Sequence, residues 1–127
     1  MHAKNLFDYA VIRIMPRVER EEFINVGVIV FCKAEKFLEA KYLLDNNRLL
    51  AFSPELDIEV LKANLKAMEQ ICMGSKAGGT IGALDIASRF RWLTATRSTV
   101  LQTSKVHPGY TDNAAETLEK LFIQLVI

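Results

Sequence analysis

The chain has few of the residues from which metal sites and disulfide frameworks are built. Its 127 residues include only two cysteines and two histidines. Cys32 and Cys72 are forty residues apart and show no CxxC or Cys/His spacing, so the sequence indicates neither a zinc site nor a disulfide scaffold. A disulfide would be expected only in an oxidising compartment. Two buried hydrophobic side chains are therefore the favoured interpretation of the two cysteines.

The chain also has little net charge and no long hydrophobic run. Sixteen Lys and Arg against fifteen Asp and Glu leave a formal charge of +1, which excludes an overall basic coat for nucleic acid. No segment approaches the roughly 18 apolar residues of a membrane span, and the N-terminus has no apolar signal-peptide core. We expect a cytoplasmic protein without a membrane segment. With 50% hydrophobic residues, this length predicts one domain over residues 1–127.

The sequence motifs of common enzymes are absent. There is no P-loop GxxxxGK[ST], no GxGxxG after a strand and no HExxH. Only His2 and His107 could act as histidine bases, and a pair formed by Ser98 or Ser104 with His107 has no acid placed beside it. The sequence therefore assigns no catalytic residue, no metal and no cofactor, and an enzyme is the less favoured class.

Hydrophobic patterning predicts three strands in the first third of the chain. Residues 7–15, 23–32 and 37–44 are rich in β-branched and aromatic residues and are separated by short connections. Such strands should form an antiparallel meander. The first two do not alternate apolar and polar residues, so both of their faces should be covered, either by helices or by another copy of the chain.

The next part of the chain has the pattern of helices. A turn and a short helical piece are expected over residues 45–52. A long helix should follow, starting at Ser53 or at Asp57 and ending at Gly74, because apolar residues recur there at steps of three and four. The glycines within 78–82 predict a flexible connection.

The last part of the chain combines helices with one more strand. A short helix is expected over 85–95, a strand over 99–106 and a turn at 107–109. Thr111 or Asp112 should cap a final helix. The resulting order, β-β-β-α-α-β-α, predicts an α+β fold with an antiparallel sheet of about four strands and helices packed on one face.

The final helix ends in LFIQLVI and is apolar almost all round. A solvated terminus rarely has this pattern, so the helix or a sheet face is expected to form a homo-oligomer. Replacing Phe122 or Leu125 by a charged residue should then change the oligomeric state or the solubility.

Positive charge is concentrated in residues 74–110, which contain five basic residues and one acidic residue, a local charge of +4. Guanidinium groups and hydroxyls suit phosphate oxygens, and an aromatic ring can stack on a base. The segment could therefore bind phosphate, a nucleotide or nucleic acid. The residues expected to do so are Arg89, Arg97, Ser98, Lys105 and His107. Alternatively, Trp92 lies in the core and Arg97 caps or pairs with a helix.

A second polar cluster surrounds the connection between the first two strands. Its members are Arg13, Arg17, Glu19, Glu22 and Asn25. Arg13 lies inside a strand and is costly to bury without a partner. A glycine in a strand, here Gly27, marks a bulge or a close backbone approach. The cluster is either a small polar binding site or a structural ion pair of Arg13 with Glu19 or Glu22 beside a solvated loop.

Four segments of the sequence carry a family resemblance. They are YAVIRIMPRVEREEFINVGVIVFC at 9–32, SPELDIEVLKANL at 53–65, RFRWLTATRSTVLQTSKVHPGYTD at 89–112 and the closing helix. In this order they resemble the bacterial domain-of-unknown-function family number three thousand and thirty-seven, and they cover nearly the whole chain. The family often has a proline near Thr96, where this chain has threonine, a difference that changes local stiffness and little else.

The resemblance implies a partner rather than an activity. Members of that family are small stand-alone bacterial proteins, often encoded beside a kinase-like protein similar to the toxin half of the HipA type. By this resemblance the protein is an accessory or regulatory partner of such a kinase-like protein.

Three functions therefore stay open. The first is a non-catalytic partner or regulator of another protein, the second an anion-binding module for nucleotide or nucleic acid, and the third an uncatalogued enzyme. A cleft that gathers Arg13, Asn25 and Arg97 would favour the second or third. Pairing of Arg13 with Glu19 or Glu22 would favour the first.

Overall fold

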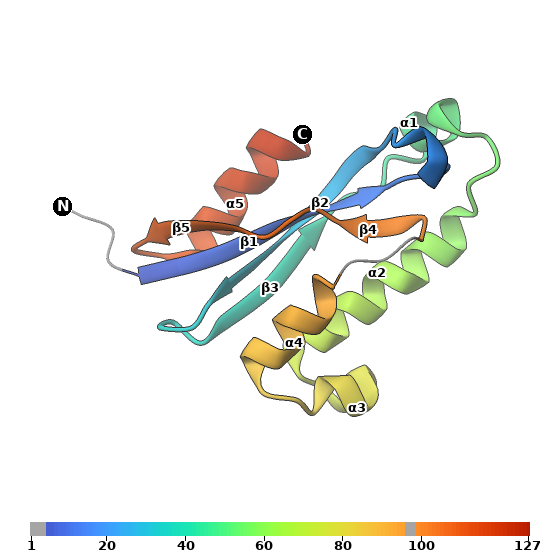
Figure 1. Cartoon of the computed structure of the whole chain (residues 1–127). Coiled ribbons are helices and arrows are strands. Elements are labelled where there is room, and N and C mark those ends of the chain that lie inside the picture. Colours follow the sequence, from blue (N-terminus) through green and yellow to red (C-terminus); the bar gives the residue numbers. More distant parts are fainter. Residues whose placement is uncertain (1–4, 96–98) are drawn as a thin grey trace.

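The computed structural model describes residues 5–95 and 99–127, and its described part is an open antiparallel sheet of five strands with helices packed on it (Figure 1). Strands β1 (Asn5–Ile14), β2 (Ile24–Cys32) and β3 (Phe37–Tyr42) form the predicted meander. The α+β class is confirmed, and the sheet has one strand more than the four that the sequence indicated.

The additional strand comes from residues that were expected to form a turn. Instead of one strand over 99–106, the chain forms β4 (Leu101–Thr103) and then β5 (His107–Thr111), and both pair with β1. Pro108 cannot donate to a strand ladder, but β5 pairs on one side only, where a proline is tolerated. A proline-glycine sequence was therefore misread as a turn.

The helices begin and end at residues with recognisable caps. Asp57 accepts a hydrogen bond from the Val60 N–H and starts α2 (Ile58–Met73), so the Asp57 alternative is correct and the start at Ser53 is wrong. Gly74 ends α2 with a φ of 71°. Asn113, rather than Thr111 or Asp112, caps the last helix. The other helical segments are α1 (Asn46–Phe52), α3 (Gly79–Gly82), α4 (Ile86–Leu93) and α5 (Ala114–Leu125), with single 3-10 turns η1 (Val18–Arg20) and η2 (Lys76–Gly78).

Helices cover both faces of the sheet, which corrects the prediction of one covered face. Ile29 and Phe31 of β2 point into a core shared with α2 and α4, whereas Val28 and Val30 pack against α5. Figure 1 shows α5 and the α2–α4 group on opposite sides of the strands. The apolar residues on both faces of β1 and β2 thus have their cover within the chain.

The apolar end of α5 is largely used inside the molecule. Phe122 and Val126 are buried against the sheet, and Leu125 is partly buried. Ile123 is 60% exposed and is the apolar residue of this helix that a partner could reach. A charge at Phe122 would therefore disturb the fold before it disturbed an oligomer, so a test of self-association belongs at Ile123.

Gly27 lies at a β-bulge, as the sequence predicted. The register between β1 and β2 shifts between Ile12 and Arg13, so that Ile12 pairs with Gly27 and Arg13 with Asn25. A Cβ on Gly27 would stand 2.7 Å from the backbone oxygen of Lys41, so β3 can approach only a glycine here. In the described ranges no helix is long and apolar enough to cross a membrane.

Candidate functional site

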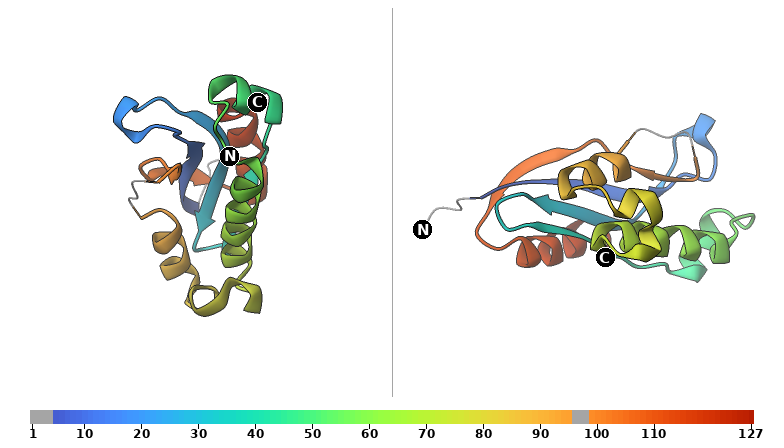
Figure 2. Two further views of the ribbon diagram at one scale, coloured as in Figure 1. Left: turned by 90° about the vertical axis from the view of Figure 1, so that its right-hand side faces the viewer. Right: turned by 90° about the horizontal axis from the view of Figure 1, so that it is seen from below.

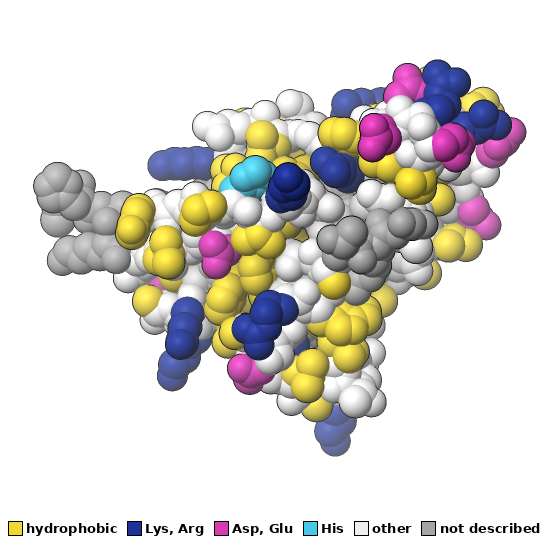
Figure 3. Space-filling model, viewed as in Figure 1, with side chains coloured by type: hydrophobic (Ala, Val, Ile, Leu, Met, Phe, Trp, Pro, Cys, Tyr) yellow, Lys and Arg dark blue, Asp and Glu magenta, His cyan; other side chains and the backbone are white. Residues whose placement is uncertain are grey.

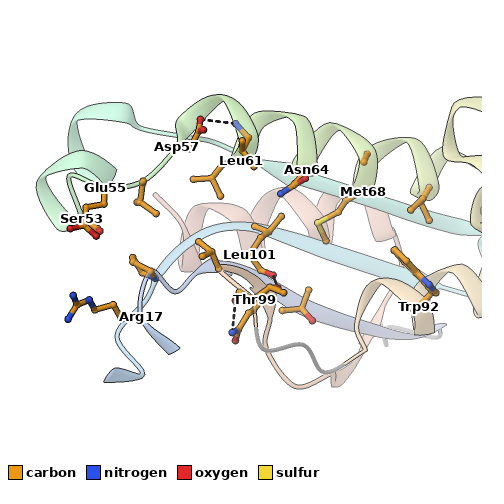
Figure 4. A pocket seen from close by; sticks show the side chains of 18 residues that line it. Arg17, Ser53, Glu55, Asp57, Leu61, Asn64, Met68, Trp92, Thr99 and Leu101 are labelled. Atoms are coloured by element: carbon orange, nitrogen blue, oxygen red, sulfur yellow. Dashed lines mark hydrogen bonds between the residues drawn. The ribbon is translucent and has the colours of Figure 1, made fainter. Parts of the chain in front are cut away.

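A cleft of about 700 Å³ runs between α2 and β4 (Figure 4). Its floor is apolar and includes Leu61, Met68 and Leu101. Its rim is polar, with Asn64 on the helix and Thr99 before the strand. An apolar cavity of this size with a few polar groups at its edge is typical of a ligand site.

The spacing of residues on α2 builds the upper wall. Leu61, Leu65 and Met68 form the stripe that faces the core. Val60, Asn64 and Ala67 follow at steps of four and three along the flank of that stripe and line the cleft. Val60 is 51% exposed. The helix therefore has one row of residues in the core and, beside it, a second row that lines the cleft.

The two ends of the cleft differ in chemistry. Figure 4 shows Trp92 at one end and Arg17, Ser53 and Glu55 at the other. Trp92 is 40% exposed, so its predicted place in the core is wrong. Within the described residues, neither Glu55 nor Asp57 forms an ion pair.

The lower wall of the cleft is the outermost strand on this side of the sheet. Figure 1 shows β4 with β1 on one side and α2 along the other. The Met15 N–H donates to the Val100 carbonyl at 2.7 Å, and the Ser104 N–H donates to the Val11 carbonyl at 2.8 Å. Every second residue of this segment thus bonds to β1 through its backbone N–H and C=O groups. The residues between them direct these groups away from β1, towards the outer edge of the sheet.

The polar residues at the β1–β2 connection do not form one site. Arg17 lines the cleft, but Glu19 is exposed in η1, and Glu22 pairs with Arg20. Figure 2 shows this connection projecting from the sheet, and Figure 3 shows acidic and basic side chains mixed at that corner. The predicted ion pair of Arg13 with Glu19 or Glu22 is absent among the described residues.

Arg13 and Asn25 are direct neighbours across β1 and β2. The Arg13 guanidinium carbon lies 4.2 Å from the centre of the Phe23 ring, and its buried Nε has no hydrogen-bond partner. The Asn25 Nδ2 donates to the Leu125 carbonyl at 3.1 Å, which ties β2 to the last turn of α5. Asn25 therefore has a structural contact, whereas the contact that the described residues give the Arg13 guanidinium is the Phe23 ring.

The residues of the basic segment are also spread apart. Arg89 Nη1 donates to the carbonyls of Ile71 and Cys72 at 2.9 and 2.7 Å, so this guanidinium holds the C-terminal end of α2. Lys105 is exposed between β4 and β5, and the His107 ring stands 5.2 Å from that of Tyr9. Figure 3 shows Lys and Arg side chains beside the histidine on this face. Two further candidates, Arg97 and Ser98, lie outside the described residues.

The comparison with known families agrees with the sequence resemblance. The family model described as "Protein of unknown function (DUF3037)" matches residues 9–126. The chain belongs to the DUF3037 family. No curated protein and no solved structure matches it. Both walls of the cleft in this DUF3037 protein lie within the matched residues.

Two titratable side chains at the core of this DUF3037 protein, Cys72 and Tyr42, have pKa values that burial raises. Burial raises the pKa of the Cys72 thiol to about 12, so the thiolate needed for a nucleophile is scarce at neutral pH. Burial, with Glu69 nearby, also raises the pKa of Tyr42. Over residues 5–95 and 99–127, no three His, Cys, Asp or Glu residues are grouped to hold a metal ion.

The α2 wall was the part of the site that sequence reasoning missed. The apolar repeat of α2 was interpreted as core alone, and the row of Val60, Asn64 and Ala67 beside it drew no attention. The sequence did contain a sign of this wall, because Val60 is apolar but falls outside the stripe that packs in the core.

Proposed function

We propose that this DUF3037 protein is a non-catalytic binding module that holds a segment of a protein partner in the cleft between α2 and β4. The supporting observation is the cleft itself, about 700 Å³ with an apolar floor and a polar rim. Of the candidate site residues that the structure describes, Arg17 lines the cleft, whereas Glu19 and His107 lie elsewhere.

Exposed apolar side chains on both walls favour a protein partner over a small polar ligand. Val60 on the helix, Val100 before the strand and Trp92 at the end are 51%, 38% and 40% exposed. Aromatic and aliphatic side chains that converge on one cleft, with polar groups around them, have the composition of the centre of a protein interface. The proposal takes them as the anchor points of the partner.

The partner to test first is the kinase-like protein of the HipA type that the family resemblance implies. The module would act on it as a regulator or accessory subunit. Nothing in this role requires a reaction at the cleft, which agrees with a site built from apolar contacts and backbone edges.

Co-purification from cells that express both proteins tests the proposal. Val60→Glu places a charge in the cleft at an exposed position and should reduce the retained partner about tenfold or more, because a desolvated charge opposes burial. Met73→Glu is the matched control, since Met73 is an exposed apolar residue of the same helix but does not line the cleft. Equal retention by the wild type and Val60→Glu, with both proteins folded, would contradict the cleft as the binding surface.

Anion binding is the second candidate, and the observation that favours it is the guanidinium of Arg13. This group is partly buried, lies on the Phe23 ring and has no carboxylate partner among the described residues. A phosphate could pair with the charge of this guanidinium, which no carboxylate among the described residues neutralises.

A fluorescent single-stranded oligonucleotide tests this candidate. Its affinity should fall steeply with added salt, and Arg13→Met should weaken it about tenfold at low salt, because each phosphate contact adds to the salt dependence. Arg91→Met is the control, because Arg91 is exposed on α4 and contacts Ser88. No binding at low salt would remove the nucleic-acid version of the idea.

A further inference from the structure

Among the described strands, β4 pairs with β1 alone, so its outer edge gives the cleft a directional backbone surface. We infer that the partner's segment binds as an added β-strand along this edge, directs apolar side chains at Leu61 and Met68, and presents a cationic side chain to Glu55 and Asp57. This inference rests on the proposed function and specifies its ligand as an extended peptide segment. Strand addition to an exposed edge is a recurrent mode of peptide recognition.

The register of β4 identifies the atoms that would pair with the segment. Gln102 is paired with Arg13 and occupies the position between Val100 and Ser104, whose backbone groups bond to β1. Leu101 and Thr103 therefore direct their N–H and C=O groups away from β1. The Leu101 carbonyl accepts a hydrogen bond from the Thr99 hydroxyl at 2.8 Å. Among the described residues, nothing bonds to the two N–H groups or to the Thr103 carbonyl, so these three groups could pair with a strand.

Strand β4 is short, but its sequence has none of the residues that oppose strand pairing at an edge. Natural sheets protect their edges with short strands, lysine, proline, bulges or a covering element. Strand β5 contains Pro108 and follows Lys105, and β3 at the opposite edge contains Glu39 and Lys41. Strand β4, with the sequence Leu-Gln-Thr, has no charge and no proline. The sheet therefore offers its pairing groups where the cleft lies.

The walls of the cleft determine which side chains the segment should carry. Side chains alternate between the two faces of a strand, so every second one would point at α2. There it would meet Leu61 and Met68, which favours an apolar residue. At the Arg17 end, Glu55 and Asp57 form no ion pair among the described residues, and the nearby Arg20 is paired with Glu22, which favours a Lys or Arg in the segment.

A peptide pool provides the probe. In its peptides, Val, Ile or Leu alternates with polar residues, and each peptide includes one Lys or Arg. The peptides have about six residues, which at 3.3 Å each is long enough to extend along the whole of β4. Members that bind the wild type and lose affinity with Val60→Glu are cleft ligands. For such a peptide, the amide hydrogens of Leu101 and Thr103 should exchange about tenfold more slowly when it is bound, whereas Gln102 is already bonded to β1.

Two changes at one position separate the backbone from the side chain. Thr103→Pro removes an outward N–H while the pairing of Gln102 with β1 remains, and it should weaken the peptide about tenfold. Thr103→Ala keeps the N–H and should bind within about twofold of the wild type. Should Thr103→Pro misfold, the peptide can be changed instead. A peptide with alternate backbone nitrogens methylated lacks its own N–H donors for the pairing with β4, and it should fail to bind.

The charge at the Arg17 end has its own pair of variants. Glu55→Gln should weaken peptides that contain Lys or Arg and leave their uncharged analogues unchanged. Glu59→Gln is the control, because Glu59 is exposed and faces Lys62. Equal loss for charged and uncharged peptides would contradict the cationic contact.

The outcomes distinguish the inference from the proposed function. A peptide that depends on Val60 but leaves the exchange of Leu101 and Thr103 unchanged overturns strand addition and preserves the cleft as a binding site. A pool without any Val60-dependent binder contradicts both. Slowed exchange at the two amides, with loss of binding in Thr103→Pro alone, supports strand addition.

Discussion

At the scale of single residues, Arg89 connects segments of the chain through three hydrogen bonds to backbone carbonyls. Its Nη1 reaches two carbonyls at the end of α2, and its Nε donates to the Leu84 carbonyl at 3.0 Å. The C-terminal end of a helix has a partial negative charge, so a guanidinium is the fitting partner there. This contact connects α2 to α4 and fixes the position of the cleft wall.

Arg89→Met should lower the free energy of unfolding by roughly 2–3 kcal/mol, because three charge-assisted hydrogen bonds are lost and the carbonyls of α2 are left without this partner. Urea denaturation measures the change. Arg91→Met on the same helix removes an exposed contact with Ser88 and should change stability by less than about 0.5 kcal/mol. Equal effects of the two substitutions would show that Arg89 is not the cap.

Glu35 is a second residue whose contacts lie far apart in sequence. Its Oε1 accepts the Ala114 N–H at 3.0 Å and its Oε2 accepts the Asn5 Nδ2 at 3.0 Å. The bond from the Ala114 N–H, and then the bond from Asn5, lower the pKa of Glu35 below its ordinary value of 4.5. A lowered pKa in the folded state means that the stabilisation is present above pH 4.5 and is lost as the pH falls below it.

Glu35→Gln should therefore be less stable than the wild type at about pH 7, by about 0.5 kcal/mol, the usual effect of an exposed charge at a helix N-terminus. The difference should shrink towards about pH 3, because the wild-type carboxyl takes up its proton as the pH falls through its lowered pKa. Urea denaturation at both pH values measures it. A difference that is the same at both would contradict a charge effect.

At the scale of elements, the sequence predicted the meander and the long helix well, because their signals are local. The apolar stripe and the glycine that ends α2 depend on neighbours within a few residues, and both are confirmed. The β4–β5 division was missed because it depends on a partner nearly a hundred residues earlier. The hydroxyl of Ser104 accepts the Val11 N–H at 2.8 Å, and β5 then resumes pairing at His107 opposite Tyr9.

The candidate site could be predicted only in part, for the same reason. The two segments singled out in the sequence do border the cleft, through Arg17 and through Trp92 and residues 99–103. The charged members that the structure describes do not converge, because Arg89 is engaged by α2 and Arg13 lies on the sheet beside Asn25. Residue type indicated chemistry, but only the packing of α2 against the sheet decides which side chains share a cavity.

At the scale of the whole molecule, the two faces of the sheet differ in how they are covered. The α5 side is closed by a buried core, and Lys41 pairs there with Glu119 at 2.6 Å. The α2 side has both a core and a cleft, because α2 stands over β3 and leaves space beside β4. The near-zero net charge agrees with a surface that binds through apolar contacts and a strand edge rather than through long-range electrostatic attraction.

A partner that occupies the cleft between α2 and β4 should protect both of its walls. Hydrogen exchange of the chain, alone and in complex with the co-expressed kinase-like protein, measures this protection. We expect slower exchange over residues 60–71 and 99–103 in the complex, with α5 unchanged. Protection confined to α5, or to the β1–β2 connection, would contradict it.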